Sequence, residues 1–306
     1  MPSSLENVSL IIKTFERQEA LERLLDSIAA QGYTDCPVLV ADDSEAPYRG
    51  PIMDRYADLV DEYVTLPFDS GLSKGRNELL KRVETDYFVL NDDDFVYDER
   101  TDLGWMREQL GQRDLDLLGG VVYEPRTMDV SRLATLARQG ALRTLFRALQ
   151  EEGRELYERT IRGNPEKTVR FSGDIEVDGE TVALVPTSYS SPLTRCDYTL
   201  NFFVADTEAI RDRLGGWNDD LKICEHWEFF YRAAMNELRV ATTEEVGVVH
   251  RPMQQETYSH HRFSKEEACR RQGLKTHGLK TLILEGYTAM ELENGHEGPD
   301  PSDSEK

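Results

Sequence analysis

Three consecutive aspartates follow a short apolar run, and together they could hold a divalent cation. Residues 87–90 (Tyr-Phe-Val-Leu) are typical of a buried strand, and Asp92, Asp93 and Asp94 come after one further residue. A cation relieves the repulsion between adjacent carboxylates, and Mg²⁺ or Mn²⁺ prefers such hard oxygen ligands while bridging the protein to a diphosphate. We expect Asp94 to be the first metal ligand, Asp92 to lie nearer a ribose or a metal-bound water, and Asp93 to belong to the same nucleotide site. The alternative is an exposed acidic cluster that only ends a strand.

Two further polar clusters follow apolar runs nearer the start of the chain. Asp42 and Asp43 follow one such run, and a carboxylate there could accept hydrogen bonds from a base or a ribose. After the first run, Thr14, Phe15 and Arg17 occupy a turn where Thr14 could bond the base and Arg17 could approach a phosphate. Capping of the next helix explains either cluster without a ligand.

Residues 70–77 (Ser-Gly-Leu-Ser-Lys-Gly-Arg-Asn) combine glycines, two cations and the start of a helix. Backbone N–H groups and positive charge at a helix start can hold a diphosphate. We therefore place Gly71, Lys74, Arg76 and Asn77 in the nucleotide site. A plain capped helix is the alternative.

Strands and helices must alternate to bring these clusters together. Apolar and amphipathic patterns predict strands over 8–12, 37–43, 62–66 and 87–90, and helices over 18–31, 52–60 and 72–83. Such alternation predicts an α/β fold, in which a mostly parallel central sheet has helices on both faces and binds ligands beyond the carboxyl ends of its strands.

Sequence patterns in the second half of the chain predict the elements that form the acceptor side of the same domain. We expect strands over 115–122, 197–204 and 239–250, a helix over 225–237, a helical insert over 130–162, and a hairpin over 169–185 that turns at Asp178-Gly179. The predicted organisation is one domain over 1–263, with a nucleotide half over 1–123 and an acceptor half over 124–263. A helical extension over 264–293 and a disordered acidic tail over 294–306 follow.

Composition excludes some partners and favours others. The formal net charge is −22, from 36 basic and 58 acidic residues, which argues against binding to nucleic acid. An acidic surface poor in lysine is typical of salt-accumulating halophiles, and an acidic mesophile protein is the alternative. The 4 cysteines lack metal-finger spacing, and no apolar run is long enough to span a bilayer, so we predict a cytoplasmic protein. The arginine-rich insert could touch a membrane surface at the inner face, although a solvated helix face is the favoured explanation.

These motifs, taken in order, resemble the family 2 glycosyltransferase superfamily. Thr-Phe-x-Arg, Ala-Asp-Asp-Ser, Gly-Leu-Ser-x-Gly-Arg-Asn and Asp-Asp-Asp-Phe are followed by Leu-Leu-Gly-Gly, Arg-Cys-Asp, Asn-Phe-Phe, Glu-His-Trp-Glu-Phe-Phe and Val-His, over residues 8 to 250. Within that superfamily the chain is most similar to the β1,4-N-acetylgalactosaminyltransferases of ganglioside synthesis. The resemblance implies a GT-A-type Rossmann-like domain and a metal-dependent, inverting transfer of a hexose or N-acetylhexosamine. The implied donor is a UDP-sugar, and the implied acceptor is a glycan or is linked to a lipid.

The resemblance also implies a base and a third metal ligand. An acidic motif at the start of a late helix supplies the base in that superfamily, and Glu225, His226 and Glu228 match its place. We rank Glu228 first, Glu225 second and His226 third, while helix capping is the alternative. His250 ends an apolar strand where many such enzymes place a metal-binding histidine, and neutral imidazole suits Mn²⁺.

Two other functions compete with this prediction. A sugar-1-phosphate nucleotidyltransferase would also use an α/β domain and a metal-binding carboxylate, but it should open with a glycine-rich phosphate loop, and residues 13–17 contain no glycine. A non-catalytic glycan-binding protein of the same fold is the other alternative, and the intact acidic clusters argue against it.

Overall fold

The computed structural model describes residues 5, 7–125, 166–169, 171–189, 192–252, 265–284 and 287–292. The predicted helical insert over 130–162 and the predicted tail over 294–306 lie outside these residues.

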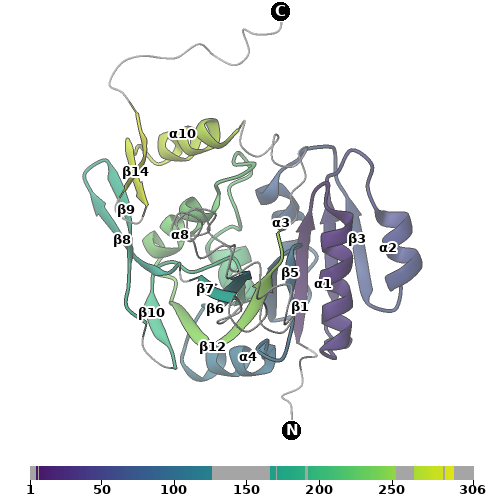
Figure 1. The fold of residues 1–306 in the computed structure, drawn as a ribbon. Helices are drawn as coiled ribbons and strands as arrows, with labels where there is room; N and C mark the ends of the chain where they lie inside the picture. Colours follow the sequence, from purple (N-terminus) through teal and green to yellow (C-terminus); the bar gives the residue numbers. More distant parts are fainter. Residues whose placement is uncertain are drawn as a thin grey trace, which may run out of the picture.

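A mixed sheet runs through the centre of the molecule (Figure 1). Its strands are β1 (Val8–Thr14), β2 (Val38–Asp42), β3 (Val60–Thr65), β4 (Tyr87–Asp92), β5 (Phe95–Val96), β6 (Leu117–Pro125), β7 (Glu166–Val169), β10 (Thr194–Cys196), β11 (Phe203–Asp206) and β12 (Val240–His250). The main path is β10-β12-β6-β11-β4-β1-β2-β3, with β5 paired to β12 and β7 paired to β6. Neighbours from β4 to β3 are parallel, as are β6 and β12, whereas β11 is antiparallel to both of its neighbours. The prediction of a mostly parallel α/β sheet is therefore confirmed, and its second half is mixed.

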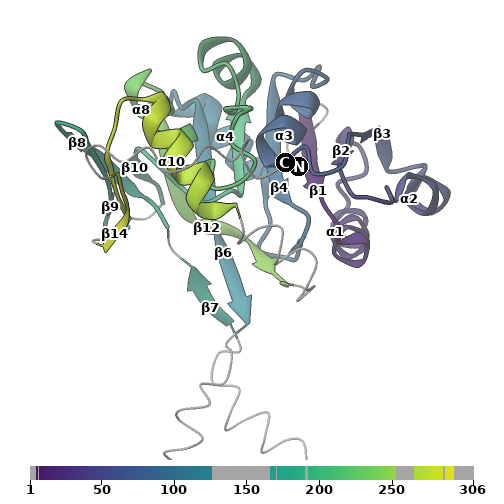
Figure 2. The same cartoon turned by 90° about the horizontal axis from the view of Figure 1, so that it is seen from above.

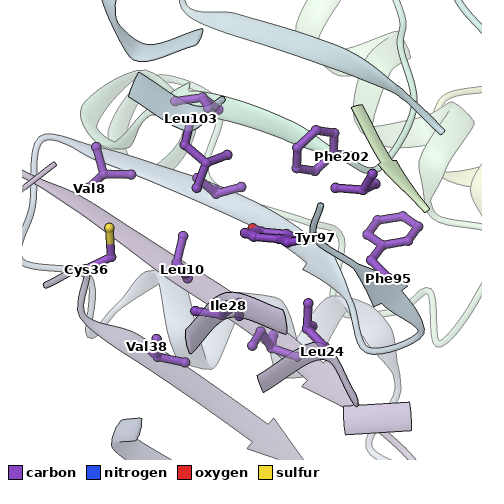
Figure 3. Close-up of a cluster of buried hydrophobic side chains, with 14 of the residues drawn as sticks. Val8, Leu10, Leu24, Ile28, Cys36, Val38, Phe95, Tyr97, Leu103 and Phe202 are labelled. Carbon is purple, nitrogen blue, oxygen red and sulfur yellow. The ribbon is translucent and has the colours of Figure 1, made fainter. Parts of the chain in front are cut away.

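Helices cover both faces of this sheet because successive side chains of β1 point to opposite sides. Leu10 and Ile12 enter one hydrophobic core and Ile11 enters the other. The helices are α1 (Gln18–Ala30), α2 (Arg49–Tyr56) and α4 (Leu103–Gln112) over the first core, and α3 (Leu72–Leu80) and α8 (His226–Met235) over the second. In the first core, Leu24 and Ile28 of α1 lie on the same side as Leu10 of β1, and Phe202 packs near Tyr97 (Figure 3).

A second, four-stranded sheet lies beside the main one, and its order is β14-β13-β9-β8 (Figures 1 and 2). β8 (Gly173–Asp178) and β9 (Thr181–Pro186) form the predicted hairpin, whose two-residue turn is Gly179-Glu180, one residue later than expected. Gly179 adopts φ +58°, a conformation that glycine reaches without steric cost. The hairpin edges the second core through Val182 and Leu184.

The predicted helical extension over 264–293 is wrong in its second half. It contains one helix, α10 (Glu266–Thr276), followed by β13 (Thr281–Leu284) and β14 (Tyr287–Glu291). β13 adds to β9 in parallel, so that Leu282, 0% exposed, joins the second core. Strand pairing with β9 and burial of Leu282 therefore accompany an extended conformation in this segment.

Two other predicted elements have different bounds. The helix predicted over 52–60 begins at Arg49, because Pro51 is tolerated in a first helical turn, and it ends at Tyr56. The strand predicted over 197–204 is interrupted, because Asp197 N–H and Tyr198 N–H both donate to the Gly173 carbonyl of the second sheet. β10 and β11 flank this crossover between the sheets.

No helix in the described part of the chain is long and apolar enough to cross a membrane. The cysteines at 36, 196, 224 and 269 are all free thiols.

Candidate active site

A cleft of about 610 Å³ opens at the carboxyl ends of β1 and β4 and extends across α8 to α10. Seven of the site residues predicted from the sequence line it, from five separate segments. They are Arg17, Arg76, Asp92, Asp94, Glu225, His226 and His250.

Asp94 and His250 form the centre of one end of the cleft. Phe95 pairs with His250 across β5 and β12, which sets the Nε2 of His250 3.2 Å from an Oδ2 of Asp94. The Nδ1 of His250 lies 3.1 Å from Glu124, so both ring nitrogens face carboxylates. Burial opposes a high pKa at His250, but these two carboxylates raise it. Burial likewise opposes ionisation of Asp94, yet His250 and Arg17 lower the pKa of that carboxyl, which is therefore ionised at neutral pH.

Arg17 lies against the acidic triplet. Its guanidinium pairs with Asp93 and donates to Asp94 at 2.6 Å. Thr14 holds the other side of Asp93 through an Oγ1 that donates at 2.7 Å. Burial raises the pKa of Asp93, which is 0% exposed, so Arg17 is needed to compensate its charge. Thr14 and Asp93 thus stand behind the cleft and position Asp94 and Arg17.

Asp94 and His250 supply some, but not all, of the ligands that a divalent cation needs. Among the residues that the structure describes, no three His, Cys, Asp or Glu side chains form a complete metal-binding group. Asp94 and His250 nevertheless offer a carboxylate oxygen and an imidazole nitrogen side by side in the cleft. Such a pair suits Mn²⁺ when a diphosphate and waters complete the coordination.

Arg76 joins the acidic triplet to the start of α8. Its Nη2 donates to Asp92 at 3.0 Å and its Nη1 donates to Glu225 at 2.5 Å. The residue is 1% exposed, so these carboxylates neutralise a buried charge. Gly75 permits this placement, because a Cβ there would stand 2.3 Å from Cδ of Lys13 on β1. The predicted phosphate-binding arginine therefore bridges two acids of the site.

His226 begins α8 and is held in one tautomer. Its Nε2 lies 2.6 Å from the Thr199 carbonyl, which can only accept, so Nε2 carries the hydrogen and Nδ1 carries the lone pair. Burial lowers the pKa of His226 to about 4, although the nearby Glu225 opposes this shift. The imidazole is therefore neutral in the physiological range and able to accept a proton.

Glu228, ranked first as the base, is turned away from the cleft. It is 0% exposed and does not line the cavity. Its Oε1 accepts from Arg232 at 2.9 Å and lies 2.8 Å from the Nε2 of His277. These partners lower the pKa of Glu228 against the effect of burial. This position does not favour the first-ranked assignment, because the carboxylate ties α8 to α10 and lies outside the cleft lining.

Asp42 and Asp43 are also buried, at 0% and 1% exposure. Asp42 accepts from two backbone N–H groups, those of Ser44 and Tyr48, and from the Tyr63 hydroxyl at 2.6 Å. Asp43 accepts from the Gly71 N–H at 2.7 Å and from the ammonium of Lys13. These contacts do not favour the predicted pairing of either carboxylate with a base or ribose, because their oxygens already accept from the loops after β2 and before α3 and from Lys13.

Two residues of the predicted phosphate loop, Gly71 and Asn77, are packed against or bonded to other segments of the protein. Gly71 adopts φ +96°, and a Cβ there would stand 2.6 Å from Cα of Lys222. Asn77 donates to the Trp217 carbonyl and to Asp219, both at 2.7 Å, and so fastens the loop before α8. Lys74 is exposed on α3 and does not line the cleft. Phe15 lies outside the cleft lining too, with its ring 5.7 Å from that of Phe68.

Sequence reasoning missed several residues that line the cleft, which are Lys13, Glu124, Phe171, Glu266 and Arg270. Lys13 was a detectable signal, because a lysine inside an apolar strand must find a buried partner. The others come from segments that fold onto the site from far along the chain, and their local sequence carries no such mark.

Comparison with known proteins agrees with this geometry. The model of the family described as Glycosyl transferase family 2 matches residues 9–167. The human β-1,4 N-acetylgalactosaminyltransferase 1 is 31% identical over 268 residues, which cover 84% of this chain and 43% of that protein. The chain thus spans less than half the length of this curated relative.

Two solved structures share the fold. The structure of S. aureus TarS 1-349 in complex with UDP-GlcNAc has a TM-score of 0.55 at 16% identity, over 83% of this chain and 60% of that one. The mannosyltransferase PcManGT from Pyrobaculum calidifontis, in complex with GDP-Man and Mn²⁺, has a TM-score of 0.54 at 16% identity, over 88% of this chain and 64% of that one. The fold is therefore the GT-A-like α/β fold predicted from the motifs. With more than half of its residues matched by the family model, this chain belongs to glycosyl transferase family 2.

Proposed function

We propose that this protein is an inverting, metal-dependent glycosyltransferase that moves an N-acetylhexosamine or hexose from a UDP-sugar to a glycan or lipid-linked acceptor. The observation that carries the proposal is a single cleft with two functional ends. Asp94 and His250 form one end, and His226 and Glu225 form the other. Arg76 links the ends by contacting Asp92 and Glu225.

Asp94 and His250 would hold Mn²⁺ or Mg²⁺ in this proposal. The bound cation would neutralise charge on the diphosphate as the nucleotide leaves. Asp92 lines the cleft beside them, and its orientation is fixed by Arg76 at 3.0 Å. Arg17 compensates the negative charges of Asp93 and Asp94, and so keeps the two carboxylates stable in this position before the cation binds.

His226 is our choice for the base that accepts the proton of the acceptor hydroxyl. Its neutral imidazole is oriented by the Thr199 carbonyl, and the neighbouring carboxylate of Glu225 favours the charged form. That carboxylate would stabilise the imidazolium produced during transfer. The Arg76 guanidinium holds Glu225 in place.

Membership of the family argues against the nucleotidyltransferase alternative. A glycan-binding protein without activity would not need a neutral imidazole able to accept a proton and a carboxylate–imidazole pair in the same cleft.

A uridine donor is the first testable part of this proposal. The sequence relatives are N-acetylgalactosaminyltransferases, which favours a UDP-N-acetylhexosamine here. In the presence of Mn²⁺, calorimetry is expected to show UDP binding at least about tenfold more tightly than GDP, a difference of roughly 1.4 kcal/mol. Release of UDP from UDP-N-acetylgalactosamine, with and without acceptor, is the matching activity assay. Tighter binding of GDP would overturn the donor assignment.

We also propose a high-salt environment for this protein. With a net charge of −22, the acidic side chains should repel one another at low ionic strength, and concentrated salt should screen this repulsion. The melting temperature is therefore expected to rise between dilute buffer and about 1 M potassium chloride. A scanning-calorimetry series in potassium chloride tests this expectation, and a flat or falling melting temperature would contradict it.

A further inference from the structure

Apolar side chains form part of the cleft lining. Val122 of β6 and Val169 of β7 are cross-strand partners, and both line the cavity. Phe171 lines it too, with its ring centre 5.3 Å from that of His226. A partly exposed aromatic ring therefore lies beside the proposed base, where an acceptor must be placed.

The helix α10 contributes an ion pair to the same cleft. Glu266 and Arg270 lie one turn apart, contact each other, and both line the cavity. The next pair round the helix, Glu267 and Arg271, has the same spacing but does not line it. Its side chains are 76% and 41% exposed, against 33% and 22% for the first pair. The helix thus turns one of two equivalent ion pairs toward the site.

Contacts along its length fix α10 in this position. Lys265, just before the helix, pairs with Asp69 of the loop before α3. Gly273 lies so close to Trp227 of α8 that a Cβ would stand 2.6 Å from Cζ2 of the indole. His277 at the end of the helix meets the buried Glu228. The Glu266–Arg270 pair is therefore held against the helix that carries the base.

We propose that Phe171 and the Glu266–Arg270 pair form the acceptor subsite, and that the acceptor presents a pyranose ring there. The inference rests on the proposed function. A pyranose has a face of C–H groups, which an aromatic ring can cover, and a rim of hydroxyls. A carboxylate accepts hydrogen bonds from such hydroxyls, and a guanidinium donates to neighbouring oxygens. The pair can therefore recognise the hydroxyl groups at two positions of the ring. This assigns acceptor recognition partly to the C-terminal segment, beyond the residues that the family model matches.

The test uses UDP-N-acetylgalactosamine, Mn²⁺ and three probe acceptors, the p-nitrophenyl β-glycosides of galactose, glucose and N-acetylglucosamine. Release of UDP above the acceptor-free rate is expected with at least one of them. For that glycoside, Arg270→Ala should raise the acceptor KM about tenfold and leave the donor KM within about twofold. Arg271→Ala, the matched control on α10, should change neither. Phe171→Leu should also raise the acceptor KM. Phe171→Tyr should keep the acceptor KM close to the wild-type value, because the ring is retained.

Each other outcome has a definite meaning. If acceptor-free UDP release occurs but no glycoside stimulates it, the pyranose subsite is wrong while the proposed function stands. Equal effects of Arg270→Ala and Arg271→Ala on the acceptor KM, or a change confined to the donor KM, would also overturn the subsite. Absence of UDP release under every condition, also when UDP-N-acetylglucosamine, UDP-galactose and UDP-glucose replace the donor, would overturn the proposed function itself and the subsite with it.

Discussion

Replacement of His226 by glutamine is expected to lower kcat by about 10² or more, with little change in UDP affinity. Glutamine can still donate to the Thr199 carbonyl, but it cannot accept the acceptor proton. Glu225→Gln should lower kcat as well, because it removes the negative charge that favours the imidazolium and that pairs with Arg76. Steady-state transfer kinetics and UDP calorimetry on the same preparations provide the measurements.

The pH profile gives an independent check of this base. Because the pKa of His226 is lowered to about 4 from 6.5, the active neutral form persists until the pH falls toward 4. His250 also titrates, with a pKa raised by Asp94 and Glu124, so the profile is measured at saturating Mn²⁺, which competes with its protonation. Under that condition the kcat of the wild-type protein should stay flat where free imidazole titrates and fall only in more acidic solution. An acidic limb near 6.5 that persists as Mn²⁺ is raised would contradict the assigned environment of His226.

Glu228→Gln is the control for the same helix. Since Glu228 contacts Arg232 and His277 and lies outside the cleft, its loss should lower the free energy of unfolding, by about 3 kcal/mol for a broken buried pair. Turnover per folded molecule should remain close to normal. If Glu228→Gln instead abolishes kcat while His226→Gln is active, the assignment of the base to His226 is wrong.

The second large effect concerns the metal end of the cleft. Asp94→Asn is expected to lower Mn²⁺-dependent transfer by about 10² or more, since several kcal/mol of charge stabilisation are lost. Asparagine keeps the side-chain size but supplies no anionic oxygen to the cation. The measurements are transfer rates over a Mn²⁺ titration and calorimetry of Mn²⁺ with UDP. The concentration of Mn²⁺ that gives half-maximal activity should rise in parallel.

This substitution should also cost stability, because Asp94 contacts Arg17 and His250. A matched control is Asp116→Asn, which removes a buried carboxylate paired with Arg239 and Arg213 away from the cleft. Both variants should unfold at lower urea concentration, but only Asp94→Asn should change the Mn²⁺ dependence. Wild-type Mn²⁺ dependence in Asp94→Asn would remove this residue from the metal site.

Sequence alone determined the framework of this protein. Apolar β-branched runs alternating with amphipathic segments predicted β1 to β4 and the helices between them, because those patterns reflect burial on one or both sides. The acidic triplet directly after β4 lies at the carboxyl edge of the sheet, since chain direction in a parallel strand fixes which end faces the ligand. Asp94 and His250, 156 residues apart, were both predicted as metal ligands and meet in the structure.

Only the tertiary structure decided which polar groups face the cleft and which are satisfied inside the protein. Glu225 and Glu228 were both candidates for the base, but Glu225 is the N-cap, outside the regular helix, and bonds Arg76, whereas Glu228 bonds α10. From the sequence, Asp42 was also a candidate for binding a ligand, yet its carboxylate accepts hydrogen bonds from a tyrosine hydroxyl and two backbone N–H groups. A sequence shows that a carboxylate is present, but its partner depends on distant segments. Burial then makes those partners decisive, because an unpaired charge in the interior costs too much free energy to be left.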